Sequence, residues 1–339
     1  MAVRKLSKKK LKKLLEELAR DRVVYGPVSS DGQVSFAEAS GGELALEKAI
    51  SDRPPKNVFF PQAEVLLTYS GGETKDETYT GRPAAVFGAR PCDARAFAVI
   101  DRVFLGEPPE DPCWRARRRD SLVLALACNR PASTCFCHWM GGGPFGEEGV
   151  DVLLTDLGSE FLLKACTPAG ERALGASKVL QEAGEDDLAA SEQLKGQAEA
   201  RLSGSLDVAE AKRALEALWD EGLWEDFSSR CLGCAACAYL CPTCHCFDVQ
   251  DEGSASRGRR LRIWDACMFG LFTKEASGHN PRTATRERLR QRVMHKFSYF
   301  PDKFKAVACV GCGRCVRACP SNVDLREVLR RAVQEAVKR

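Results

Sequence analysis

Short apolar runs cut by glycine, proline and aspartate dominate the first half of the chain. Four of them have the length and aliphatic content typical of buried strands, namely residues 58–60, 84–88, 122–127 and 152–154. Residues 94–104 lie between two of these runs and favour a helix. Because strands that alternate with helices indicate an α/β domain, we expect one over residues 1–176.

Apolar residues at helical spacing predict helices at three further places. Residues 5–20 read as an amphipathic surface helix, or as one that docks on a membrane surface or a partner. Residues 177–228 are rich in alanine, glutamate, leucine and lysine and predict a helical linker, with Asp207 capping residues 208–218. Asp324 is expected to cap a last helix. Its apolar face consists of Leu325, Val328, Leu329, Val333 and Val337.

Two cysteine runs of identical spacing stand in the last third of the chain. The first is Cys231-x2-Cys234-x2-Cys237-x3-Cys241-Pro242, and the second is Cys309-x2-Cys312-x2-Cys315-x3-Cys319-Pro320. This is the bacterial ferredoxin pattern for [4Fe-4S] clusters. We therefore expect an α+β ferredoxin-type domain with two clusters over residues 229–339, which carries an insertion at residues 242–308.

In proteins with two such runs, the fourth cysteine of each run binds the other cluster. Cluster I is thus expected to use Cys231, Cys234, Cys237 and Cys319. Cluster II is expected to use Cys309, Cys312, Cys315 and Cys241. A pair of zinc sites is the alternative, although zinc motifs usually show paired C-x2-C with longer gaps.

Four more cysteines follow two of the predicted strands. Cys92 comes after residues 84–88, Cys128 comes directly after residues 122–127, and Cys135 and Cys137 lie on the next loop, before Gly141, Gly142 and Gly143. If the strands are parallel, these thiols meet at the carboxyl edge of the sheet, where open α/β sheets place ligands. They predict a third cluster, and the alternative is four buried structural cysteines. We read Cys113 and Cys166 as structural.

The insertion contains a further cysteine group. Cys244, Cys246 and Cys267 can supply three ligands to a fourth cluster, completed by His245, His279 or His295. The alternative is that they pack around cluster II without a metal. A polar stretch at residues 251–260 is expected to be a loop. A basic segment is expected to be a solvated or partner-facing surface, and it consists of Arg282, Arg286, Arg288, Arg290, Arg292 and Lys296.

Composition and charge restrict the classes of partner and the cellular setting that the sequence favours. A net charge of +3 over 339 residues is too small to favour a polyanionic partner such as nucleic acid. Seventeen cysteines in metal spacings, with neither a signal peptide nor an apolar stretch of membrane-spanning length, indicate a cytoplasmic protein. Exposed clusters are sensitive to oxygen, so we expect an anaerobic setting. The G-x-G-x-x-G dinucleotide fingerprint is absent after any predicted strand.

The motifs resemble those of a known family, the iron–sulfur beta subunits of cytoplasmic sulfhydrogenases (hydrogenase/sulfur reductase), which includes an iron–sulfur subunit of anaerobic sulfite reductase. The resemblance runs nearly end to end. It rests on FFPQAE at 59–64, RPCD at 90–93, TCFC at 134–137, CPTCHCFD at 241–248, WDAC at 264–267 and HKF at 295–297.

This resemblance implies an electron-transfer subunit of an oxidoreductase complex rather than a self-sufficient enzyme. The implied partners are a flavin subunit that handles NAD(P)H and a hydrogenase, sulfur, sulfite or heterodisulfide reductase subunit. One alternative is a catalytic reductase whose N-terminal cluster binds substrate. Another is a cluster-bearing nucleic-acid protein, for which binding would depend steeply on salt.

Overall fold

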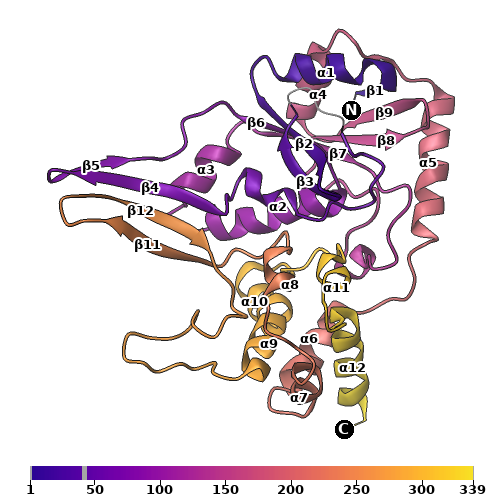
Figure 1. Cartoon of the computed structure of the whole chain (residues 1–339). Helices are drawn as coiled ribbons and strands as arrows, with labels where there is room; N and C mark the ends of the chain where they lie inside the picture. Colours follow the sequence, from indigo (N-terminus) through magenta and orange to yellow (C-terminus); the bar gives the residue numbers. More distant parts are fainter. Residues whose placement is uncertain (1, 40–43, 339) are drawn as a thin grey trace. The chain divides into compact units, whose positions relative to one another are not determined.

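A mixed eight-stranded β-sheet organises the first of two structural units (Figure 1). The structure is a computed structural model and describes residues 2–39 and 44–338. The first unit comprises Met1–Phe60, Tyr79–Ser203 and Val310–Cys312, and the second comprises Pro61–Thr78, Gly204–Cys309 and Gly313–Arg339.

The strands of the large sheet lie in the order β10-β1-β9-β8-β7-β6-β2-β3. Their bounds are β1 Val3–Ser7, β2 Val23–Ser30, β3 Gln33–Glu38, β6 Ala84–Ala89, β7 Leu122–Leu126, β8 Val152–Asp156, β9 Glu160–Ala165 and β10 Gln181–Glu182. Strands β2, β6, β7 and β8 run parallel, and the outer pairs run antiparallel. The predicted strands at 84–88, 122–127 and 152–154 are confirmed as β6, β7 and β8.

Both faces of the central strands are buried, which explains their continuous apolar sequence. Every residue of β6 and β7 is buried. In β7, Leu122, Leu124 and Leu126 belong to a core cluster that also contains Leu14 and Leu18 of α1 (Leu11–Leu18). The remaining helices of this unit are α2 Pro91–Phe104, α3 Pro112–Arg118, α4 Pro168–Ala176 and α5 Glu185–Glu199, with short 3₁₀ turns η1 Lys8–Lys10, η2 Pro55–Val58 and η3 Cys137–Met140.

The predicted strand at residues 58–60 is wrong. Pro54 and Pro55 fix the backbone for the 3₁₀ turn η2, and the chain then passes through a turn. Phe59 is buried completely because it packs edge-on against Phe97, with ring centroids 4.8 Å apart, and against Trp114. The apolar run thus serves an aromatic core, which periodicity alone does not distinguish from a strand.

The predicted helix at residues 5–20 is only partly correct. Residues Val3–Ser7 form β1, which pairs with β9 in the register Leu6↔Phe161, and the α-helix is confined to α1. Leu6 is 1% exposed, so pairing at the sheet edge buries it in the core and overrides the helical preference of the lysine-rich sequence.

A four-stranded antiparallel sheet in the order β11-β12-β4-β5 belongs to the second unit (Figure 1). Its strands are β4 Ala63–Ser70, β5 Glu73–Asp76, β11 Phe247–Gly253 and β12 Arg257–Trp264. The predicted loop at residues 251–260 is therefore wrong, because it forms most of a hairpin. Cross-strand ion pairs join Arg259 to Glu252 and Arg260 to Asp251, which explains why a polar sequence forms a hairpin here.

Helices make up the rest of the second unit. They are α6 Val208–Ala217, α7 Leu223–Ser228, α8 Ala236–Tyr239, α9 Thr285–Met294, the π-helix η4 His295–Tyr299, α10 Phe300–Phe304, α11 Arg314–Arg317 and α12 Leu325–Val337. The predicted caps are confirmed, since Asp207 accepts hydrogen bonds from Ala209 and Glu210 and Asp324 accepts one from Arg326. Val337 is exposed rather than packed.

The mixed α/β architecture is confirmed. The two units do not follow the predicted segments 1–176, 177–228 and 229–339, since α5 belongs to the first unit and β4 and β5 belong to the second. These domain boundaries stay a prediction. Within the described residues, no helix combines the length and apolarity needed to span a bilayer.

Candidate iron–sulfur sites

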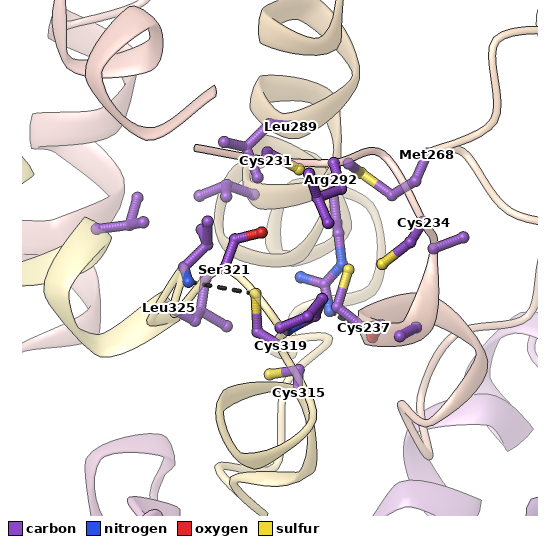
Figure 2. A pocket seen from close by; sticks show the side chains of 17 residues that line it. Cys231, Cys234, Cys237, Met268, Leu289, Arg292, Cys315, Cys319, Ser321 and Leu325 are labelled. Carbon is purple, nitrogen blue, oxygen red and sulfur yellow. Dashed lines mark hydrogen bonds between the residues drawn. The ribbon is translucent and has the colours of Figure 1, made fainter. Parts of the chain in front are cut away.

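Five cysteines from two distant parts of the sequence line one cavity in the second unit. Cys231, Cys234 and Cys237 come from the first ferredoxin run, and Cys315 and Cys319 come from the second. Figure 2 shows these thiols around the cavity. The backbone N–H of Val323 donates a hydrogen bond to Cys319 Sγ at 3.2 Å. The structure therefore brings together the set predicted for cluster I, including its crossed member, and also Cys315, which the sequence assigns to cluster II.

The remainder of this cavity is mostly apolar. Its walls include Met268, Leu289, Val293, Leu325 and Val328. Burial, followed by the neighbouring Cys237, Cys319 and Cys234, raises the pKa of the Cys231 thiol, because a thiolate loses its hydration there. Four thiols in an apolar enclosure suit a [4Fe-4S] cluster held by four cysteines, whose potential depends on burial and on hydrogen bonds to sulfur.

A single metal ion requires a different spacing between the thiol sulfurs than a cluster does. Zinc needs its thiolates about 3.8 Å apart, given a Zn–S bond of ~2.3 Å and tetrahedral geometry. In the described parts of the chain, no three histidine, cysteine or acidic side chains are placed to share one ion. In a cubane each thiolate binds a different iron atom, so the thiols stand further apart.

The ligands predicted for cluster II are divided between the units. Cys241, Cys309 and Cys315 belong to the second unit and Cys312 to the first, so this ligand set rests on the sequence spacing. Cys241 is buried. A hydrogen bond from Cys244 lowers its pKa well below the usual value, and Lys296, Arg292 and Thr243 act in the same direction although burial opposes them. These contacts favour the thiolate form of Cys241.

The basic stretch of α9 is not a uniformly solvated surface, which corrects the sequence prediction. Arg286 and Arg290 are partly exposed, and they donate to the backbone carbonyls of Asp220 and Trp219 respectively. Arg292 and Lys296, in contrast, are 4% and 2% exposed. Lys296 Nζ lies 3.3 Å from Cys241 Sγ, and Arg292 Nη2 donates to the Cys237 carbonyl at 2.7 Å.

The N-terminal cysteines converge at the carboxyl edge of the large sheet. Strands β6 and β7 are parallel, so α2, which carries Cys92 in its first turn, begins beside Cys128. Burial, and then the charges of Cys128 and Cys135, raises the pKa of Cys137 to about 12. Cys92 and Cys137 line the same cavity, together with Gly141, Gly142 and Gly143. All four predicted thiols therefore gather in one region of the first unit.

Arg90 holds the strand ends that carry these thiols. Its side chain is 7% exposed. Nη1 donates to the carbonyls of Leu126 and Ala127, directly before Cys128, and Nη2 donates to Leu46 and Lys48. The carboxylate of Asp93 accepts the backbone N–H of Arg90 and starts α2. The motif Arg90-Pro91-Cys92-Asp93 is therefore a clamp between β7 and α2.

We expect Arg90→Met to lower the free energy of unfolding by about 2–4 kcal/mol, because each buried carbonyl left without a donor costs ~1–3 kcal/mol. Chemical denaturation monitored by circular dichroism measures the change. The control is Arg115→Met on α3, where the arginine is exposed and pairs only with Glu110. Equal stability of the two variants would contradict the clamp.

The middle of the second ferredoxin run packs on the N-terminal cysteine loop within the first unit. The backbone N–H of Phe136 donates to the Gly311 carbonyl at 2.8 Å, and Cys135 Sγ lies 3.9 Å from the Cys312 carbonyl. Gly311 has a φ of +63°, and a Cβ there would stand 2.4 Å from the Phe136 carbonyl oxygen. Only glycine permits this approach. The loop of the third cysteine set is thus in direct contact with a predicted cluster II ligand.

Cys244 and Cys267 of the insertion each contact a different cysteine. Cys244 hydrogen-bonds Cys241, and this contact raises the pKa of Cys244. Cys267 pairs with Cys246, which likewise raises the pKa of Cys267. Of the histidines proposed to complete a site, His245 and His295 pack edge to face with ring centroids 5.7 Å apart, and burial lowers the pKa of His295 to about 3. The fourth cluster stays a prediction.

Comparison with known proteins gives two matches. Residues 230–323 match the family described as a 4Fe-4S dicluster domain. The chain is also 29% identical over 318 residues to the sulfhydrogenase 2 subunit beta of Pyrococcus furiosus, an alignment that covers 93% of this chain and 92% of that protein. The chain is a homologue of a sulfhydrogenase beta subunit. No solved structure matches it.

The two matches confirm the family resemblance that the sequence motifs indicated. They also confirm that residues 230–323 of this chain match a 4Fe-4S dicluster domain. Sequence reasoning did not find Arg292, Lys296 and Arg90 as residues of the sites. Arg292 and Lys296 had one signal, their i,i+4 spacing, which places them on the same helix face. For Arg90, the only signal in the sequence was its place in the RPCD motif.

Proposed function

We propose that this protein is the iron–sulfur electron-transfer subunit of a sulfhydrogenase-type oxidoreductase complex. The carrying observation is the apolar cavity in which Cys231, Cys234, Cys237 and Cys319 meet, within a region that matches a dicluster domain. The relative's name, sulfhydrogenase 2 subunit beta, supports membership of a multisubunit assembly with a hydrogenase-type partner. The cofactors in this proposal are two [4Fe-4S] clusters in the dicluster domain and a third at Cys92, Cys128, Cys135 and Cys137.

The contact between Phe136 and Gly311 supports a continuous electron path. It brings the loop of the third cysteine set against the segment that carries Cys312. In the proposal, single electrons pass from a flavin subunit that handles NAD(P)H, through the three clusters, to a hydrogenase, sulfur, sulfite or heterodisulfide reductase subunit. The protein supplies thiolates, apolar enclosure and hydrogen bonds to sulfur, which together set the potentials.

A second function is favoured by the cavity beside the third cysteine set. Cys92 and Cys137 line it together with Arg95, Lys195, three glutamates and four glycines, so these thiols border a polar cavity. In that alternative the subunit is a reductase whose N-terminal cluster binds substrate. Turnover of sulfite or polysulfide by the purified subunit, supplied with a chemical reductant, would favour it over electron transfer alone.

The test of the leading proposal is a reconstitution. The isolated, cluster-loaded chain mixed anaerobically with NADH or NADPH should keep its oxidised visible spectrum, because the sequence has no dinucleotide fingerprint. Addition of a flavin subunit from the same source should bleach the cluster absorption within seconds. Dithionite reduces the clusters directly and is the control that shows that they can be reduced. Reduction of the flavin-free chain by NADH would refute the proposal.

A further inference from the structure

Two buried cations occupy one face of the helix that passes the dicluster cysteines. Arg292 lies near the end of α9, and Lys296 lies four residues later in the π-helix η4. Residues four apart lie on the same face of a helix. Both side chains are almost completely buried, at 4% and 2% exposure. A π-helix is a rare and costly element that frequently marks a functional position.

Each cation contacts a different part of the cluster machinery. Lys296 Nζ donates to Cys241 Sγ at 3.3 Å, to Thr243 Oγ1 at 3.2 Å and to the Ala308 carbonyl at 2.9 Å. Arg292 lines the cavity of Cys231, Cys234, Cys237 and Cys319, where Figure 2 shows its guanidinium beside Cys237. Its Nη2 donates to the Cys237 carbonyl, and its buried Nε has no hydrogen-bond partner.

Neither cation forms an ion pair with an aspartate or glutamate among the described residues. Burying a charge without a counterion is strongly unfavourable, so a negative partner must come from elsewhere. The thiolates around the two side chains are the available source. The Lys296 ammonium group donates to Cys241 Sγ, and an arginine guanidinium stays protonated in proteins.

We propose that Arg292 and Lys296 compensate the negative charge of the dicluster domain's two clusters and raise their reduction potentials. This inference rests on the proposed function, since it concerns the same clusters. Four thiolates bring more negative charge than the positive charge of the cubane core, and reduction adds one more electron. A fixed buried cation stabilises the reduced state more than the oxidised state. Arg292 acts mainly on cluster I, and Lys296 acts on the cluster that Cys241 ligates.

The experiment is an anaerobic redox titration of the full-length protein, monitored by EPR. Lys296→Met removes the charge and keeps the side-chain length, and Arg292→Gln removes the second charge. Each variant should lower the midpoint potential of at least one cluster. The expected shift is ~59 mV, which corresponds to a tenfold change in the equilibrium constant for one-electron reduction. Arg286→Gln is the matched control, because this arginine stands on the same helix with 34% of its side chain exposed and donates to the Asp220 carbonyl rather than to a cluster cysteine. It should leave both midpoints unchanged.

Charge-preserving variants separate electrostatics from packing. Lys296→Arg and Arg292→Lys should keep midpoints near those of the wild type. If Lys296→Met loses a cluster while Lys296→Arg keeps it, charge compensation is also supported. Intact clusters with unshifted midpoints in Lys296→Met and Arg292→Gln would overturn the inference. Loss of the cluster in both Lys296→Met and Lys296→Arg would also overturn it, because packing alone would then explain the role.

The two proposals fail in different ways. A wild-type protein that shows no cluster signals by EPR would refute the proposed function itself. If the wild-type protein has two titrating clusters, and their midpoint potentials do not change in Lys296→Met and Arg292→Gln, only the inference is refuted.

Discussion

Replacing Cys137 by alanine in the full-length chain should remove about four of roughly twelve iron atoms, the content of one cubane out of three. Cys137 is buried, and the charges of Cys128 and Cys135 act on its thiol, so it stands at the centre of the third set. Iron and sulfide analysis of anaerobically purified protein measures the loss. The EPR signals of the dicluster pair should remain, since none of their predicted ligands changes.

The matched control for this experiment is Cys113→Ala. Cys113 is also buried in the first unit, in α3, and we assign it no ligand role. Its replacement should leave the iron content unchanged. A folded Cys137→Ala protein that retains all its iron would mean that the N-terminal cysteines are structural, and the third cluster would have to be abandoned.

Replacing Cys319 by serine should abolish or strongly weaken the cluster bound by the first run, although Cys319 belongs to the second run. The reason is the shared cavity, in which Cys319 stands with Cys231, Cys234 and Cys237. Serine is a poor ligand for iron compared with a thiolate, so we expect loss of about four iron atoms and of one EPR signal.

Two further variants identify which signal is lost. Cys234→Ser, in the first run, should give the same spectrum as Cys319→Ser, and Cys315→Ser should remove the other signal. Ser321→Ala, which lies in the same cavity and has no thiol, is the control and should retain both. If Cys319→Ser instead reproduces the spectrum of Cys315→Ser, each run holds its own cluster and the crossed assignment is wrong.

The sequence predicts the cluster ligands and several local elements. Two runs with one spacing suffice to indicate [4Fe-4S] chemistry, because the number of residues between thiols limits which corners of a cubane a loop reaches. Asp207 and Asp324 are recognisable as caps since a cap needs only a short polar side chain beside the first helical turn. The aliphatic runs of β6 and β7 reveal a sheet buried on both faces.

Only the tertiary structure decided how residues distant in sequence pack on, pair with or bury a given side chain. Phe59 looks like part of a strand until Phe97 and Trp114 pack around it. The polar hairpin of β11 and β12 depends on ion pairs between residues seven and nine positions apart. Arg292 and Lys296 carry the same charge as their partly exposed neighbours Arg286 and Arg290, and only the fold buries them beside thiols. Local patterns record which chemistry a side chain offers, whereas burial and charge compensation depend on residues that are distant in sequence.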